Sequence, residues 1–241
     1  MIDFHTHILP GIDDGSRNME MSVQMLHEEL KNGVDHVVFT PHFYANRDSI
    51  DNFLKRRRKS IVRLMEEVEK DQELSGLQYD FGAEVYYFSG MGNAADISKL
   101  CITGTDIFLL EMPFCQWTDA MYEDIAKLVR KQRLTIILAH IERYIEFQKK
   151  KDVWNRIFEL PVIAQMNAGP FTRWNSRSKA IRLAKEREQI LLGSDAHNMT
   201  DRRPNLAEAQ AVIGKKLGEE FLSAQKQLEQ QLLGEQMRDY E

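Results

Sequence analysis

The chain has 241 residues, 43% hydrophobic and 29% charged, which is ordinary for a globular protein that can bury its own core. Its two cysteines, Cys101 and Cys115, exclude a disulfide framework and favour the reducing cytoplasm. The N-terminus lacks signal-peptide features, no apolar run could span a bilayer, and the net charge is −5, so we expect a cytoplasmic protein without membrane insertion or a nucleic-acid partner.

Short β-rich runs alternate with helical patterns along the whole chain. The predicted strands cover residues 1–5, 34–42, 78–85, 107–112, 134–140, 162–167 and 190–194. The predicted helices cover residues 18–30, 47–74, 118–133, 143–158, 177–188 and 206–233. Such alternation indicates βαβ units and a parallel sheet, which can close into a barrel or stay open. No repeat or flexible linker interrupts it, so we expect one domain over residues 1–241.

Candidate metal ligands lie where these predicted strands end. The first strand ends in His5-Thr6-His7, and residues at i and i+2 of a strand point to the same side, so both imidazoles can bind one metal. The acidic loop Asp13-Asp14-Gly15 follows. The later strands end at or beside His42, Glu84, Glu111, His140, Asp195 and His197. The carboxyl ends of parallel strands form one face, where active sites lie, and mixed imidazoles and carboxylates suit Mn, Fe or Zn.

Each of these signals is weak when it stands alone. A single His-x-His pair occurs without a metal more often than with one, whereas a buried glutamate such as Glu84 is expensive without a partner. The coincidence across six strand ends indicates a metal site. His27 lies within a predicted helix and His36 near the start of a strand, so we expect both to be structural or exposed.

Arginines and one further acid lie close to the same face. Arg143 follows His140, and Arg202 and Arg203 follow His197. A guanidinium group matches phosphate oxygens in a bidentate manner, although an ion pair at a helix start is an equally good explanation for any one of them. Glu142 is a candidate for orienting a ligand.

Six motifs together resemble the polymerase and histidinol phosphatase (PHP) superfamily. More narrowly, they resemble the bacterial manganese-dependent protein-tyrosine phosphatases encoded with capsule or exopolysaccharide genes. The motifs are Met-Ile-Asp-Phe-His-Thr-His, Asp-Asp-Gly, Thr-Pro-His, Gly-Ala-Glu-Val-Tyr-Tyr, Ala-His-Ile-Glu-Arg-Tyr and Ser-Asp-Ala-His-Asn. The motifs that contain Glu84 and His140 favour the tyrosine-phosphatase branch. This chain has Arg202-Arg203-Pro204 where relatives usually carry one arginine, and the register with the following residues favours Arg202.

The resemblance implies a distorted (β/α)₇ TIM-like barrel, the PHP fold, with a three-metal site that takes Mn²⁺ or else Fe, Zn or Mg. It implies His5, His7, Glu84 and Asp195 at the first metal, a bridging Glu84 with Glu111 and His140 at the second, and Asp14, His42 and His197 at the third. Arg143 and Arg202 would bind phosphate. The implied substrate is the tyrosine-rich tail of a membrane-associated kinase that controls polysaccharide export.

Several alternatives stay open at this point. A phosphatase of histidinol phosphate or another small phosphoester could use the same ligands, and a metal-binding regulatory module would have them without turnover. An amidohydrolase commonly has a lysine where this chain has Glu111. A nuclease would need more positive charge than the basic run 55–59 provides. A solvated helix face or a subunit contact is the better interpretation of that run. A thiolate phosphatase is excluded, because the positions six residues after Cys101 and Cys115 hold Ile107 and Met121 instead of arginine. The helices that begin at Arg47 and Leu206 could join copies of the chain in a homo-oligomer.

Overall fold

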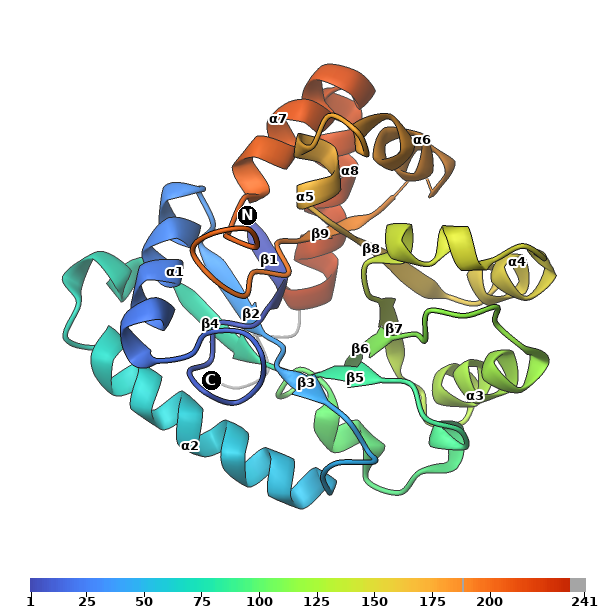
Figure 1. The fold of residues 1–241 in the computed structure, drawn as a ribbon, viewed down its shortest axis with the longest axis horizontal. Coiled ribbons are helices and arrows are strands. Elements are labelled where there is room, and N and C mark those ends of the chain that lie inside the picture. Colours follow the sequence, from blue (N-terminus) through green and yellow to red (C-terminus); the bar gives the residue numbers. More distant parts are fainter. Residues whose placement is uncertain (188, 235–241) are drawn as a thin grey trace.

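A computed structural model describes residues 1–187 and 189–234. Their strands form two parallel sheets at the centre of the molecule, with the helices around them (Figure 1). The smaller sheet has the order β1-β2-β4 and consists of Ile2–Thr6, His36–Phe39 and Gln78–Phe81. The larger sheet has the order β3-β5-β6-β7-β8-β9 and consists of His42–Phe43, Glu84–Tyr86, Ile107–Glu111, Thr135–Leu138, Val162–Asn167 and Leu191–Gly193.

Two of the predicted strands are interrupted, so the prediction of continuous strands over 34–42 and 78–85 was wrong. The first breaks at Thr40-Pro41, where proline has no amide hydrogen for a ladder, and the second breaks at Gly82-Ala83. The two breaks lie side by side, since His36 pairs with Gln78 before them and His42 pairs with Glu84 after them. The chain therefore bends twice in register and moves from one sheet into the other.

The strand series returns to its beginning. Thr6 and Ala196 form a parallel bridge, and the Asp195 amide donates to the His5 carbonyl at 2.8 Å, so the segment after β9 lies beside β1. When each interrupted pair is counted as one strand, seven strands surround a common centre. This confirms the distorted (β/α)₇ barrel and settles the choice that strand spacing had left open.

Helices cover the outside of the barrel (Figure 1). Their bounds are Met19–Lys31 (α1), Ile50–Val68 (α2), Asp119–Arg130 (α3), Asp152–Glu159 (α4), Gly169–Thr172 (α5), Arg177–Arg187 (α6), Leu206–Leu217 (α7) and Glu219–Glu229 (α8). Polar side chains set two of the starts, because Asn18 accepts a hydrogen bond from the Met21 amide and Ser49 accepts one from the Asn52 amide. None of the described helices is long and apolar enough to cross a membrane.

Three predicted helices have different limits. The helix expected over 47–74 begins after the Ser49 cap and ends at Val68, and a 3₁₀ turn (Gln72–Gly76) follows. The helix expected over 143–158 begins only at Asp152, after two 3₁₀ turns (Ile141–Arg143 and Ile145–Phe147). The helix expected over 206–233 is divided at Gly218, whose φ of +94° suits glycine and ends α7. Residue 188, the predicted end of α6, and residues 235–241 lie outside the described part of the chain.

The core lies between the strands and these helices. All residues of β2 and β6 are buried, as expected for parallel strands covered on both faces. Aromatic side chains fill the space beside β6 and β7, where Trp117 stacks on Trp154 with ring centroids 5.2 Å apart. The Tyr144 hydroxyl, also buried, accepts a hydrogen bond from the Met112 amide at 2.9 Å. This packing holds the segments after β6 and β7, next to Glu111 and His140.

Candidate metal centre

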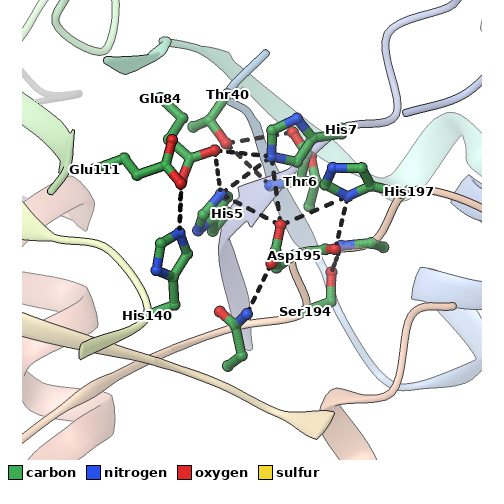
Figure 2. A network of polar contacts seen from close by, with 12 residues as sticks. His5, Thr6, His7, Thr40, Glu84, Glu111, His140, Ser194, Asp195 and His197 are labelled. Carbon is green, nitrogen blue, oxygen red and sulfur yellow. Dashed lines mark hydrogen bonds and ion pairs between the residues drawn. The ribbon is translucent and has the colours of Figure 1, made fainter. Parts of the chain in front are cut away.

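The carboxyl ends of the strands bring all nine predicted ligands together at one end of the barrel. β1 ends between His5 and His7, β3 begins with His42, β5 begins with Glu84 and β6 ends with Glu111. The other members of this set directly follow β7 and β9 or lie in the loop after β1, and they are His140, Asp195, His197 and Asp14. Figure 2 shows most of them as one connected network of polar contacts.

Glu84 occupies the middle of the network. Its Oε2 atom lies 3.2 Å from Nε2 of His5, 3.2 Å from Nε2 of His7 and 2.9 Å from Nδ1 of His42. Its Oε1 atom lies 2.8 Å from Nε2 of His140 on the other side (Figure 2). Because one carboxylate contacts four imidazoles from three other strands, it is placed to join neighbouring sites.

Two further ligand carboxylates, Asp195 and Glu111, extend the network in opposite directions. Oδ1 of Asp195 lies 3.6 Å from Nε2 of His5, 3.5 Å from Nε2 of His7 and 3.5 Å from Nδ1 of His197. Glu111 lies between His140, at 3.6 Å, and His42, at 3.8 Å. Each therefore shares an imidazole with Glu84.

A third group of side chains forms at the mouth of the site. Oδ1 of Asp14 lies 3.5 Å from Nε2 of His42 and 3.6 Å from Nε2 of His197. His7 belongs to this group as well, since all four can offer an atom to one ion. Asp14 is the most exposed of the nine ligands, with 68% of its side chain accessible.

The donor atoms fit bound cations. Nδ1 of His42, Oε2 of Glu84, Oε2 of Glu111 and Nε2 of His197 are buried and make no well-formed hydrogen bond within the described residues. Buried carboxylate and imidazole atoms without partners are costly unless a cation occupies the space between them. Three groups of possible ligand atoms lie close enough together to hold one ion each: His5, His7 and Glu84; His42, Glu84 and Glu111; and His7, Asp14, His42 and His197.

The electrostatics of the network support this fit. Burial alone would raise the pKa of Glu84, but His5 and His42 hold it well below its usual range. Burial would likewise raise the pKa of Asp195, which His5 and His7 hold below its ordinary value. By contrast, burial and the neighbouring Glu84 raise the pKa of Glu111 to about 7. Two carboxylates this close need additional positive charge if both are to be ionised.

The backbone is bent sharply at two of the ligands. His140 has a φ of +31° and Asp195 a φ of +52°, in the left-handed region that non-glycine residues seldom adopt. Both follow the end of a buried strand, and the turn points their side chains back toward the barrel axis. Such strained positions cluster at functional sites.

Two glycines let the chain segments of the site approach each other closely. A Cβ atom on Gly15 would lie 2.1 Å from the His7 carbonyl oxygen, and one on Gly193 would lie 2.6 Å from the His5 Cβ. Gly15 keeps the loop of Asp14 folded against β1. Gly193 lets β9 carry Asp195 next to His5.

The sequence did not predict the supporting roles of three residues, Asp13, Gln165 and Asn167. Asp13 accepts a hydrogen bond from Nδ1 of His7 at 2.7 Å and one from the His42 amide at 2.9 Å. Oε1 of Gln165 lies 3.1 Å from Nδ1 of His5 and accepts from the His140 amide at 2.7 Å. Asn167 donates to Oδ2 of Asp195 at 2.7 Å. Gln165 and Asn167 lie two residues apart on β8, and such residues share a face of the strand. Their spacing in the sequence could have predicted that both point toward the site.

The arginines differ in their contacts. Nη2 of Arg202 lies 2.7 Å from Oδ2 of Asp195, and Nη1 of Arg143 lies 3.7 Å from the same oxygen. The Arg143 guanidinium also lies over the Phe114 ring, 4.8 Å from its centroid. Arg203 turns away from the site and pairs with Glu28 and Glu208. Two arginines therefore border the ligand cluster, and the third joins a loop to α1 and α7.

Glu142 does not contact any of the nine predicted ligands through a hydrogen bond or ion pair among the described residues. Its carboxylate accepts two long bonds, each 3.4 Å, from the amide of Asn167, the residue that holds Asp195. Burial raises its pKa to about 8. Any effect of Glu142 on a ligand is therefore indirect.

The residues set aside in the sequence analysis are structural. His27 pairs with Asp71 at 2.8 Å, and His36, which is buried, pairs with Asp80 at 2.7 Å. The expectation that the basic run 55–59 is a solvated face was partly wrong, because Arg57 is buried and donates to the Gly82 carbonyl at the break between β4 and β5. Burial raises the pKa of the Cys101 thiol to about 12, which makes a thiolate there unfavourable.

Comparison with known proteins identifies similar sequences over nearly the whole chain. A family model described as "Capsular polysaccharide synthesis, CpsB/CapC" matches residues 1–228. The tyrosine-protein phosphatase CpsB of Streptococcus agalactiae serotype III (strain NEM316) is 28% identical over 230 residues, which cover 91% of this chain and 92% of the relative. The tyrosine-protein phosphatase YwqE of Bacillus subtilis (strain 168) is 26% identical over 239 residues, which cover 92% of this chain and 87% of the relative.

A similar fold is also known from crystallography. It comes from crystal structures of YwqE from Bacillus subtilis and CpsB from Streptococcus pneumoniae, described as "unique metal-dependent tyrosine phosphatases". The superposition has a TM-score of 0.84 at 23% sequence identity and covers 97% of this chain and 94% of the other. The barrel fold of this chain is therefore an architecture already observed by experiment.

Proposed function

The chain belongs to the CpsB/CapC family of capsular polysaccharide synthesis, and on this premise we propose that it is a metal-dependent protein-tyrosine phosphatase. The observation that carries the proposal is the position of Glu84, whose two oxygens contact four imidazoles beside two arginines. A cluster of this kind suits the hydrolysis of phosphomonoesters, in which ions and arginines neutralise the phosphoryl oxygens.

The proposed ligand sets follow the three groups of side chains. His5, His7, Glu84 and Asp195 would hold the first ion; Glu84, Glu111 and His140 the second; and Asp14, His42 and His197 the third. We propose Mn²⁺, with Fe, Zn or Mg as alternatives, because imidazole–carboxylate sites accept several divalent ions. Bound divalent ions would polarise the phosphoryl oxygens and lower the pKa of water.

The protein's own residues would bind and orient the substrate. Arg143 and Arg202 reach Asp195 from the same side, so their remaining N–H groups can hold phosphoryl oxygens next to the first site. Asn167 donates to the Asp195 oxygen that these arginines approach and keeps that carboxylate in place. Asp13 and Gln165 do the same for His7 and His5.

Aromatic rings beside the cluster favour an aryl ester. Tyr44 and Tyr86 follow His42 and Glu84 by two residues, and their ring centroids are 5.6 Å apart. On the other side, the Phe114 ring stacks near His140 with a centroid distance of 6.3 Å. A tyrosyl ring can pack against such a surface, and a tyrosyl oxygen with a pKa of about 10 leaves more readily than an alkoxide.

The proposed physiological substrate is a phosphotyrosine-bearing protein, and more narrowly the tail of the tyrosine kinase that regulates polysaccharide synthesis. The family's description, capsular polysaccharide synthesis, supports that context. A cytoplasmic location is part of the proposal and agrees with two cysteines that are both free.

The deciding experiment compares substrates on metal-loaded protein. Mn²⁺-loaded protein is assayed with a phosphotyrosine peptide, with histidinol phosphate and with a chromogenic aryl phosphate, each with and without EDTA. We expect EDTA-sensitive hydrolysis with a preference for the phosphotyrosine peptide. A strong preference for histidinol phosphate would replace the proposed substrate class, and no hydrolysis of any of the three would favour a metal-binding module without turnover.

A further inference from the structure

A cavity lies beside the metal centre, and only part of its lining is used in the proposed chemistry. It has a volume of about 380 Å³, and its lining includes Asp195 but no histidine. Pockets of about 300–1,000 Å³ hold small ligands, so this one has room for more than a single phosphoryl group. Four arginines line it, namely Arg143, Arg173, Arg202 and Arg203.

Three of these four arginines already have carboxylate partners. Arg143 and Arg202 approach Asp195 and are the residues assigned to the scissile phosphoryl group. Arg203 is paired with Glu28 and Glu208. Arg173 has no carboxylate within 4 Å in the part of the chain that the structure describes, and its one side-chain hydrogen bond goes to the Asp201 carbonyl at 3.4 Å. Arg173 thus supplies the positive charge of this cavity that is still available to a ligand.

The backbone holds Arg173 in a fixed place although its side chain is exposed. Phe171, two residues earlier, is fully buried. The Arg177 side chain donates to the carbonyls of Phe171 and Thr172 at 2.9 and 2.8 Å, and the Arg177 amide donates to the Arg173 carbonyl at 3.0 Å. Three hydrogen bonds therefore hold the backbone of the turn between α5 and α6 around Arg173.

We infer that Arg173 determines substrate specificity by binding a second anionic group of the substrate peptide, next to the phosphotyrosine. This inference rests on the proposed function. Its ligand is a carboxylate side chain or a second phosphoryl group, which share the same geometry toward a guanidinium. Trp174, adjacent in the chain and 90% exposed, offers an optical signal for peptide binding next to Arg173.

The test uses three peptides that share one phosphotyrosine. One has neutral flanking residues, one carries a glutamate beside the phosphotyrosine, and one carries a second phosphotyrosine. The intact Mn²⁺-loaded chain, Arg173→Gln and the control Arg182→Gln are compared by kcat/KM. p-Nitrophenyl phosphate is included as a substrate that has no second anionic group. Arg182 is a matched control because it lies on α6, 73% exposed and outside the cavity.

We expect the unsubstituted chain to favour at least one anionic peptide over the neutral one by about tenfold, mostly through KM and less so at high salt. Arg173→Gln should remove that preference and leave the neutral peptide and p-nitrophenyl phosphate unchanged, whereas Arg182→Gln should keep it. A preference for the doubly phosphorylated peptide alone identifies phosphate as the group bound, and a preference for both identifies any anion.

Three results would overturn the inference: no preference in the unsubstituted chain, a preference that survives Arg173→Gln, or an equal loss on every substrate. The same peptides can be made with a non-hydrolysable phosphonate in place of the phosphotyrosine phosphate. Their binding, measured by the fluorescence of Trp174, tests Arg173 without turnover. If neither p-nitrophenyl phosphate nor any of the peptides is hydrolysed, the proposed function fails, and these binding titrations still decide whether Arg173 recognises the second anion.

Discussion

At the scale of single residues, Glu84 and Asp195 divide their oxygens between different tasks. Both oxygens of Glu84 face imidazoles, whereas Asp195 turns Oδ1 toward histidines and Oδ2 toward Arg143, Arg202 and Asn167. Asp195 therefore couples the ligand cluster to the arginines. Glu84 has no such second partner, and its burial is tolerable only because cationic or metal-bound groups surround it.

Glu84→Gln removes the negative charge from the centre of the cluster and keeps the volume of the side chain. We expect the hydrolysis of aryl phosphate to fall by about a thousandfold, because positively charged groups at the phosphoryl oxygens supply most of the stabilisation in such sites. Circular dichroism should show a native fold. Glu220→Gln, on the exposed start of α8, is the control. Turnover close to that of the unsubstituted chain would contradict the assigned role of Glu84.

Arg202 and Arg203 are neighbours with opposite expected effects. Arg202→Ala should lower kcat/KM for a phosphotyrosine peptide by about a hundredfold to a thousandfold, with little change in thermal stability. Arg203→Ala should keep most activity and lose up to about 1 kcal/mol of stability, since its partly exposed pairs with Glu28 and Glu208 would be broken. Parallel kinetics and thermal melts of the two variants check both, and an activity loss confined to Arg203→Ala would reverse the assignment.

At the scale of elements, the loop after β1 depends on one residue without a side chain. The Gly15 amide donates to Asp13, and the Ser16 amide donates to the His7 carbonyl, so the loop folds back onto the strand it has just left. This return places Asp14 over His42 and His197. No Cβ fits at Gly15 in this arrangement.

Gly15→Ala should displace Asp14 while leaving the barrel intact. We expect activity to fall by about a hundredfold, the usual effect of moving a catalytic group by about 1 Å. Gly76→Ala is the matched control, because a Cβ atom on Gly76 would meet nothing within 4 Å and the φ of Gly76 is not left-handed. Equal activities in both variants would show that the loop position does not matter for turnover.

Helix α1 carries a further buried carboxylate, Glu29. Glu29 is fully buried against Ser194 and near Asp3, and burial, followed by the Asp3 carboxylate, raises its pKa well above the ordinary value of 4.5. Below that ordinary value Glu29 is protonated in both the folded and the unfolded chain. As pH rises toward the higher folded pKa, the unfolded chain releases this proton first, so the contribution of Glu29 to stability is lost with increasing pH.

In Glu29→Gln the side chain at this position is neutral at every pH. The melting temperature of this variant should therefore rise relative to that of the unsubstituted chain from about pH 5 to about pH 8. Thermal melts at several pH values measure it. Glu20→Gln, at an exposed position of the same helix, is the control. A difference that does not vary with pH would contradict the raised pKa.

At the scale of the whole molecule, the predicted ligands tie together strands from both ends of the sequence. β1 and the segment after β9 meet through Thr6 and Ala196, so His5 and Asp195 can share partners although 190 positions separate them. An ion bound at this seam would hold the barrel closed. Binding to the folded chain alone should therefore stabilise it by mass action.

Removal of metal should lower the melting temperature without unfolding the protein. At a Mn²⁺ concentration a hundredfold above Kd, one site contributes about 2.7 kcal/mol, which corresponds to about 5–10 °C for a chain of this size. Calorimetry of EDTA-treated protein titrated with Mn²⁺ measures the shift. The shift should be much smaller in Glu84→Gln, and an equal shift in that variant would place the ion elsewhere.

Much of this molecule could be predicted from local sequence. Strand ends carrying His5, His7, Glu84 and Asp195 could be identified because alternation and burial patterns are local properties, and the chemistry of those side chains does not depend on the fold. The expectations of one domain over residues 1–241, and of a homo-oligomer, stay predictions.

Only the tertiary structure decided how these residues combine. The paired breaks at Pro41 and Gly82, the left-handed turns at His140 and Asp195, and the role of Asp13 all depend on neighbours distant in sequence. The same holds for the contacts of Arg202 and Arg203. These neighbours in sequence have different partners, Asp195 in one case and Glu28 and Glu208 in the other. Sequence determined which chemical groups lie at the strand ends, because the order of residues along the chain is covalent. Closure of the barrel decided which of these groups meet, because contacts between distant strands exist only once the chain has folded.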